Sequence, residues 1–244
     1  MDGDQLIAVL TRHPDPRKRA RAALELGELG YDEALEPLIT MLKKDKNHLV
    51  RRDCAEGLGL LGDKTAVDAL IFSMMNDEFH YTRNEAAEAL GKLKDKKAIP
   101  HLIKFMQNDE WDFARASGAL ALADLNAKDS LPEILNCIEN EENEFTRRDM
   151  LRAVHKFRDK SSLKLLFNLI TNDESWEVRK KCAEILGWLA TPKTLEILVS
   201  VLKGDNHMLV KQEAEKALKL IARDYRMKYT TAEALLARKN ELAD

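Results

Sequence analysis

The chain has 244 residues, of which 33% are charged and 45% hydrophobic, so it is a folding chain rather than a disordered one. Its formal net charge of −3 argues against a generic nucleic-acid binder, because phosphate binding depends on a large positive excess. Only ten Gly and six Pro are present, and the abundance of Ala, Leu, Glu and Lys favours helix in nearly every window.

The cysteines and the apolar runs indicate a cytoplasmic protein. Cys54, Cys137 and Cys182 are odd in number and far apart, which predicts neither a disulfide framework nor a zinc knuckle. The N-terminus carries Asp2 and Asp4 and lacks the basic region of a signal peptide. No apolar run approaches the roughly 20 residues of a membrane span, so we expect no membrane contact.

The sequence repeats itself every 32 residues without an insertion. One column of the repeat is basic and holds Arg19, Arg51, Arg83, Arg115, Arg147, Arg179 and Lys211. An apolar column holds Leu6, Leu38, Leu70, Leu102, Ile134, Leu166 and Leu198, and a second one holds Leu26, Leu58, Leu90, Leu122, Val154, Leu186 and Leu218. Periodicity of this length is the signature of a solenoid.

The second repeat shows two helices in each unit. Apolar residues at helical spacing predict one helix over 35–42 and another over 50–61. Asn47 is placed as the N-cap of the second helix, and Gly62 ends it. Pro100 and Pro132 fall where a first helix begins, the one place where a helix tolerates proline.

This pattern predicts seven two-helix repeats within a solenoid domain over 1–223. Their approximate ranges are 1–30, 31–62, 63–94, 95–126, 127–158, 159–190 and 191–223. The register fails after Ala222, and Thr230 to Glu233 forms a capping box that opens a last helix through Leu242. We expect this C-terminal capping helix, within 224–244, to cover the open end of the stack.

A column of small residues is expected to let the second helices pack closely. It holds Ala22, Cys54, Ala86, Gly118, Cys182 and Ala214. Cys54 and Cys182 are therefore predicted to fill the core.

The string from Val50 to Gly62, VRRDCAEGLGLLG, resembles the HEAT-like repeat of the phycobilisome lyases, and TRNEAAEALG from Thr82 to Gly91 is similar to it. The resemblance covers residues 4 to about 223 and implies an all-α, right-handed α-solenoid. Proteins of this family serve as protein-binding scaffolds, bilin lyases, adaptors in archaeal taxis and a di-iron hydroxylase. The pattern consists mostly of packing residues, so it is specific for the fold and not for the function.

The resemblance also allows the di-iron chemistry to be tested by residue. In that hydroxylase, His-Glu pairs follow the basic column of several repeats. The corresponding pairs here are Arg52-Asp53, Asn84-Glu85, Arg148-Asp149 and Gln212-Glu213. Because every histidine is absent, we interpret these carboxylates as ordinary exposed helix residues and predict no metal and no cofactor.

No other enzyme chemistry stands out in the sequence. His48 and His80 share a column, but neighbouring helices lie about 8–10 Å apart, too far for successive members to bind one ion. There is no nucleophile elbow and no Gly-rich phosphate loop. An enzyme interpretation rests only on the bilin lyases of the family, which lack a recognisable catalytic motif.

Acidic residues recur six positions before the basic column, and we interpret the two columns as a structural Arg–Asp ladder that fixes the register of the repeats. The resemblance implies pairing within and between repeats. The acidic members are Asp45, Asp77, Asp109, Glu141, Asp173 and Asp205.

The outward positions of the second helices, which line the concave face in this family, are unusually apolar. They include Leu49, Leu60, Tyr81, Phe113, Leu120, Phe145, Trp188, Leu209 and Leu220. The N-cap column holds Asp15, Asn47, Asn143 and Ser175, but Phe79 and Trp111 in repeats three and four. Two successive repeats thus lack the polar N-cap of the others. This departure indicates either a recognition surface or rings that pack over the inter-helix turn.

We therefore predict a non-enzymatic scaffold or adaptor that binds a protein or peptide in its concave groove, as a monomer or weak oligomer. The candidate binding residues are Phe79, Tyr81, Trp111, Phe113, Phe145, Trp176, Trp188, Arg148 and Arg152. Carboxylates are interspersed among Arg148, Arg152, Lys156, Lys180 and Lys181, which favours a mixed-charge face over a phosphate track. The alternative function is bilin or tetrapyrrole handling, and nucleic-acid binding comes third.

Overall fold

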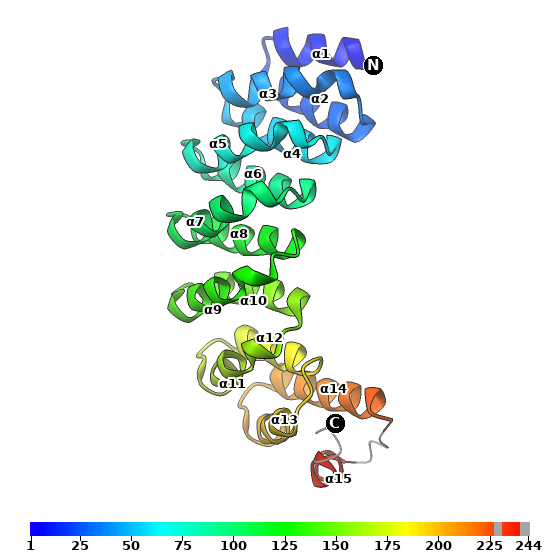
Figure 1. Ribbon diagram of the computed structural model, residues 1–244, viewed down its shortest axis with the longest axis vertical. Helices are drawn as coiled ribbons and strands as arrows, with labels where there is room; N and C mark the ends of the chain where they lie inside the picture. The colour runs from blue at the N-terminus through cyan, green and yellow to red at the C-terminus, as the bar shows by residue number, and fades with distance from the viewer. Residues whose placement is uncertain (227–230, 240–244) are drawn as a thin grey trace. The chain divides into compact units, whose positions relative to one another are not determined.

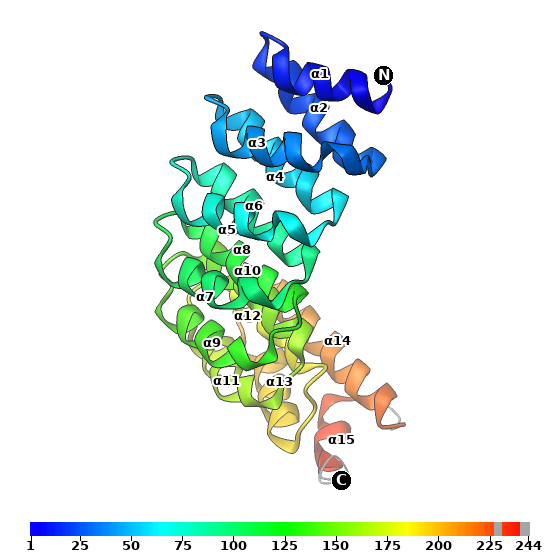
Figure 2. The ribbon, with the colours of Figure 1, turned by 45° about the horizontal axis from the view of Figure 1, so that its top comes forward.

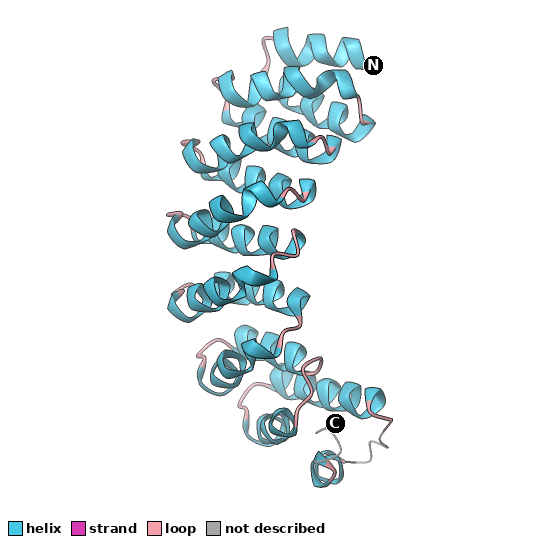
Figure 3. Cartoon of the chain, in the orientation of Figure 1, coloured by secondary structure: helices cyan, strands magenta, loops and turns pink. Residues whose placement is uncertain are grey.

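A computed structural model of the chain describes residues 1–226 and 231–239. In these residues it contains α-helices, short 3₁₀ turns and no strand, which confirms the all-α class (Figures 1 and 3). Each repeat is a helical hairpin, and the hairpins follow one another as an α-solenoid. The pairs are α1 (Gly3–Arg12) with α2 (Pro16–Leu29), α3 (Leu35–Lys44) with α4 (His48–Leu61), α5 (Val67–Asn76) with α6 (His80–Leu93), α7 (Ile99–Asn108) with α8 (Asp112–Asp124), α9 (Leu131–Asn140) with α10 (Glu144–Phe157), α11 (Leu163–Asn172) with α12 (Trp176–Leu186), and α13 (Pro192–Gly204) with α14 (Met208–Asp224).

The chain divides into two compact units, Met1–Glu133 and Ile134–Asp244, with the boundary inside α9. In the first unit the second helices α2, α4, α6 and α8 form one layer, and each contacts the next (Figure 2). The first helices α1, α3, α5 and α7 form the other layer, and each packs against its own hairpin partner. The apolar stripes of both layers meet in between, where Leu38, Leu58, Leu70 and Leu90 are fully buried.

The second unit repeats this arrangement with α10, α12 and α14 in one layer. A last helix, α15 (Ala232–Ala237), contacts α13 and α14 and buries Leu235. Its N-cap is Thr231, which accepts a hydrogen bond from the N–H of Ala234, so the predicted start at Thr230 is wrong by one residue. The predicted N-cap Thr230 and the predicted end at Leu242 lie outside the described residues.

The local signals for helix ends are present as the sequence predicts. The side chain of Asn47 accepts a hydrogen bond from the N–H of Leu49 at the start of α4, and Gly62 ends that helix with a φ of 79°. Pro100 lies in the first turn of α7, where a missing N–H has no consequence. A single 3₁₀ turn precedes most first helices: Asp32–Ala34, Lys64–Ala66, Lys96–Ala98, Lys128–Ser130 and Lys160–Ser162.

Within each unit, the arginines of the basic column donate hydrogen bonds both to the turn of their own repeat and to an aspartate of the next repeat. Arg51 donates from Nε and Nη2 to the two carboxylate oxygens of Asp77, at 2.7 and 2.9 Å, and from Nη1 to the carbonyl oxygen of Asp45, at 3.0 Å. Arg115 likewise donates from Nη1 to the carbonyl oxygen of Asp109, at 2.9 Å. The same two-pronged bond joins Arg19 to Asp45, Arg83 to Asp109, Arg147 to Asp173 and Arg179 to Asp205.

Glycines permit the close approach of successive second helices in the first unit. A Cβ added to Gly27 in α2 would lie 2.6 Å from the Cα of Gly57 in α4, and one added to Gly57 would lie 2.6 Å from the carbonyl oxygen of Ala23. The column of small residues that was predicted to separate successive second helices does not lie at this contact. Gly118 lies against Met106 of α7 in its own repeat, at 3.0 Å from the added Cβ, so the column faces the first helix instead. Cys54 and Cys182 of this column are fully buried.

We predict that Arg83→Ala lowers the free energy of unfolding by about 3–5 kcal/mol, because it leaves the buried carboxylate of Asp109 without its charge partner. The two side chains are only 9% and 6% exposed. Chemical denaturation provides the measurement. Adding Asp109→Asn, which removes the stranded charge, should recover part of the loss, so strictly additive effects would contradict the ladder. Arg21→Ala is the matched control, since Arg21 is 81% exposed and such surface pairs contribute about 0–1 kcal/mol.

We also predict that Gly57→Ala destabilises the protein, although alanine is the better helix former. The added methyl overlaps the backbone of α2, and such overpacking typically costs about 1–3 kcal/mol. Gly204→Ala at the end of α13 is the control, because nothing lies within 4 Å of its added Cβ. Its stability should hold or rise, by up to about 1 kcal/mol. Equal thermal shifts for the two variants would show that the helices are not in close contact at Gly57.

Candidate functional site

The N-cap position of the second helices holds different kinds of side chain in different repeats. Asp15, Asn47 and Asn143 accept cap hydrogen bonds from backbone N–H groups at the starts of α2, α4 and α10. Phe79 and Trp111 occupy the same position in α6 and α8, and their side chains make no cap bond.

Ser175 also lies at the N-cap of α12, as predicted, but its hydroxyl makes no cap hydrogen bond. Its buried Oγ has no hydrogen-bond partner among the described residues. Ser175 is therefore a cap by position and not by bonding.

The rings at this position lie against rings of the preceding repeat, stacked for Phe79 and His207 and tilted by 48° for Trp111. Phe79 lies parallel to His48 with centroids 4.0 Å apart, and Trp111 lies 4.3 Å from His80. In the second unit His207, at the N-cap of α14, stacks on Trp176 at 4.2 Å. In each pair, one ring (His48, His80 or Trp176) is the first residue of a second helix. The other ring lies 31 residues further on, at the N-cap of the second helix of the next repeat.

His80, Tyr81, Trp111 and Phe113 form an aromatic cluster on the first unit. Trp111 is its centre, 5.1 Å from Tyr81 and 5.6 Å from Phe113 between ring centroids, and it is half-buried. Tyr81 and Phe113 are 52% and 43% exposed. The structure thus brings together three of the predicted binding residues, while Phe79 stacks separately on His48.

The second unit holds the remaining predicted rings at separate places. Phe145 is exposed beneath the guanidinium of Arg148, with 5.6 Å from its Cζ to the ring centroid. Trp188 is also exposed, and the guanidinium of Arg158 lies 4.0 Å from its centroid. Of the other outward apolar residues, Leu60 and Leu209 are exposed, whereas Leu49, Leu120 and Leu220 are half-buried.

Arg148 and Arg152 of α10 come together with Trp176 of α12 around one hollow of about 330 Å³. We call it the basic pocket. Its other lining residues are Glu177, Lys180, Lys181 and Glu184. Lys181 pairs with Glu184 at 2.9 Å, and Arg148 pairs with Asp149 and Glu177.

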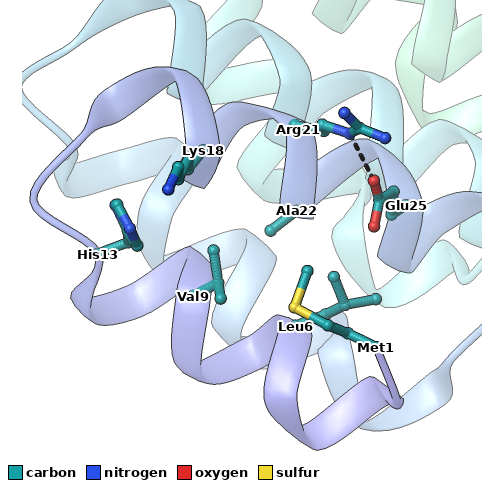
Figure 4. Close-up of a pocket in the computed structure, with 8 residues that line it drawn as sticks. All are labelled: Met1, Leu6, Val9, His13, Lys18, Arg21, Ala22 and Glu25. Atoms are coloured by element: carbon teal, nitrogen blue, oxygen red, sulfur yellow. Dashed lines mark hydrogen bonds and ion pairs between the residues drawn. The ribbon is translucent and has the colours of Figure 1, made fainter.

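A larger hollow of about 650 Å³ lies between α1 and α2 in the first repeat. Figure 4 shows Met1, Leu6, Val9 and Ala22 around it, with His13 and Lys18 at one side. Arg21 and Glu25 line the other side and are joined by a 2.6 Å ion pair. We call this hollow the apolar groove.

The family model described as HEAT repeats matches residues 3–71, 50–123 and 128–219. These matches span most of the chain. The chain belongs to the HEAT-repeat family. No curated protein matches the sequence.

Solved structures with the same fold include two full-length matches. One is the complex of CpcE and CpcF of phycocyanin lyase from Nostoc sp., with 22% identity, a TM-score of 0.58, and coverage of 98% of this chain and 94% of that chain. The other is YibA of Escherichia coli, with 20% identity, a TM-score of 0.67, and coverage of 100% and 93%. The karyopherin Kap121p, bound to the extreme C-terminus of the protein phosphatase Cdc14p, gives 13% identity and a TM-score of 0.74, and the match covers 96% of this chain and 30% of that chain.

The carboxylates at the positions of the hydroxylase pairs are less exposed in this HEAT-repeat protein than predicted. Asp53 is only 5% exposed and pairs with Arg52, and the side chain of Glu85 is 16% exposed. The side chains of Asp149 and Glu213 are 20% and 15% exposed, so the prediction of ordinary exposed residues is wrong for all four carboxylates. Among the described residues, no three His, Cys, Asp or Glu side chains gather closely enough to hold a metal ion. In the same part of the chain, no helix is both long and apolar enough to span a membrane.

Burial raises the pKa of Glu85 to about 7, and the neighbouring carboxylates of Glu88 and Glu56 add to the effect. Lys92, 4.0 Å away, and Arg52 oppose it. Glu85 is thus a carboxyl group that titrates near neutral pH on the outward side of α6.

We predict that Glu85 makes the protein less stable as the pH rises. The unfolded chain releases this proton near pH 4.5 and the folded chain near pH 7, so between these values the folded state binds more protons. Stability should fall through this window and stay lowered above it. Glu85→Gln, which cannot ionise, should unfold at higher denaturant than the wild type at pH 8, by on the order of 3 kcal/mol, and differ little at pH 4.5.

The matched control is Glu36→Gln on the exposed side of α3, for which we expect a small and constant difference. If the difference between Glu85→Gln and wild type were the same at pH 4.5 and pH 8, the raised pKa of Glu85 would be refuted.

Proposed function

We propose that this protein is a non-enzymatic scaffold or adaptor that binds a protein segment on the outward face of its second helices, anchored by the aromatic cluster. The observation that carries the proposal is that apolar rings, Phe79 and Trp111, replace the N-cap side chain in two successive repeats. An N-cap side chain contributes about 1 kcal/mol, and at positions 79 and 111 this contribution is absent.

The geometry of the cluster supports a recognition role. A tilted ring contact with His80 holds Trp111 in place, while the neighbouring rings of Tyr81 and Phe113 keep about half of their surface exposed. Rigid, partly exposed aromatic rings lose little conformational entropy on binding and are enriched among the residues that dominate protein interfaces. A protein segment that presents an apolar side chain would bury these surfaces.

Two of the structurally similar proteins were solved with protein partners, CpcE with CpcF and Kap121p with the end of Cdc14p. A solenoid gives both an extended surface made of successive helices. Protein binding by the present chain is consistent with that use of the fold.

The test compares Tyr81→Ala/Phe113→Ala with the wild type as bait in cell lysate of the source organism, followed by measurement of the affinity for the captured protein. We expect the double variant to keep its melting temperature within a few degrees, because surface changes usually stay within about 0.5 kcal/mol. Its affinity for the partner should fall at least about tenfold, as expected for two interface rings.

The matched control is Phe72→Ala, which removes a 60% exposed ring from α5, a first helix. It should leave partner binding unchanged. Equal affinity of the Tyr81/Phe113 variant and the wild type would refute the proposal, as would an equal loss in Phe72→Ala.

A second candidate function is the handling of a bilin or another tetrapyrrole, and the apolar groove favours it. Its volume of about 650 Å³ lies within the range of roughly 300–1,000 Å³ that is usual for small-molecule sites. Apolar side chains flanked by Lys18 and Arg21 suit a ligand that is apolar along its rings and carries carboxylates. A change in visible absorbance when a bilin is added to the purified protein, abolished by Val9→Asp, would favour this candidate over the first.

A further inference from the structure

We propose that the basic pocket of the second unit is a separate recognition site for an acidic peptide segment. One carboxylate of that segment would lie between Arg152 and Lys180, and its chain would lie over the Trp176 ring. The inference rests on the proposed function only in that the ligand is a protein segment. The aromatic cluster takes no part in it.

The fold leaves two cations of the basic pocket without a partner. Arg148 and Lys181 are neutralised by carboxylates, as described above. Arg152 and Lys180 have no hydrogen bond and no ion pair within the described part of the chain, although both line the same hollow. Two unpaired cations from neighbouring helices α10 and α12 favour an anionic ligand at this point.

The apolar wall of the pocket is held in place by a ring contact. Trp176 is half-buried, and its ring lies parallel to that of His207 at 4.2 Å with an interplanar angle of 11°. A ring fixed in this way offers its remaining surface to a ligand without losing conformational freedom on binding. An aromatic face beside cations suits a carboxylate-bearing side chain with an aliphatic stem.

The carboxylates of the pocket favour a peptide over a nucleic acid. Glu177 and Glu184 also line the pocket and neutralise Arg148 and Lys181, so only two cations remain unpaired there, too few for the run of phosphate contacts on which nucleic-acid binding rests. The same carboxylates can accept hydrogen bonds from the backbone N–H groups of a peptide. The chain as a whole carries a net charge of −3, so the attraction for an acidic ligand is local to this pocket.

The experiment measures binding of fluorescein-labelled octaglutamate to the purified full-length protein by fluorescence anisotropy, at low salt and at about 0.15 M salt. Octalysine and an oligothymidylate of the same length serve as comparison probes. We expect octaglutamate to bind more tightly than both, and its affinity to fall as salt is added.

The double variant Arg152→Ala/Lys180→Ala should bind octaglutamate about tenfold more weakly or worse, because it removes both unpaired cations. Lys160→Ala/Lys164→Ala is the matched control, since it removes two positive charges from exposed residues beside α11 in the same unit. It should bind as the wild type does. If the first variant is unstable, Arg152→Glu, at an exposed residue, gives the same test with one substitution.

Three results would overturn the proposal: no binding of octaglutamate by the wild type, an equal loss in both double variants, or equally tight binding of the oligothymidylate. The Tyr81→Ala/Phe113→Ala variant should bind octaglutamate normally. Failure of the proposed function at the aromatic cluster would therefore leave this result unchanged.

Discussion

The architecture depends on one carboxylate in each inter-helix turn after the first, where His13 takes this position. Asp77 accepts two hydrogen bonds from Arg51 of the preceding repeat and a third from the backbone N–H of Phe79, two residues further on. The buried charge is thus matched, and the reversal between helices is fixed without help from the N-cap side chain. A slip of one residue between repeats would strand both charges in the interior, which makes the 32-residue register energetically specific.

This carboxylate explains why the N-cap column is free to vary. Because Asp77 and Asp109 hold their turns, an aromatic residue at position 79 or 111 loses only the cap bond, about 1 kcal/mol. The ring contact, stacked on His48 and tilted against His80, offsets that loss, since aromatic pairs contribute about 0.5–1.5 kcal/mol. The two interpretations of these rings are therefore compatible: they pack on the preceding repeat and still expose surface to a ligand.

Residues that lie 32 positions apart occupy the same place in successive hairpins. Comparing them predicts the contacts within a hairpin, including the helix bounds and the Asn47 cap. Contacts between repeats join different positions of the repeat, so the two residues are not separated by 32. The separation is 26 residues for Arg51 and Asp77, 30 for Gly27 and Gly57, and 31 for His48 and Phe79. The sequence therefore does not link the histidine column to the rings, nor the glycines to their neighbours. Burial of Glu85 escapes prediction for a related reason, because part of its environment is Glu56 of the adjacent helix.

The outward face carries different chemistry in the two units because packing does not constrain it. One column of the second helices holds Leu24, Glu56, Glu88 and Leu120 in the first unit and Arg152, Glu184 and Lys216 in the second. Substitution at such positions changes stability by only about 0.5 kcal/mol, so charge there is set by something other than the core. Where an outward group does lower stability, as Glu85 does by holding its proton to about pH 7, the fold gains nothing from it. The fold likewise gains no ion pair from the unpaired cations beside Trp176, and the acidic peptide that we propose would account for them.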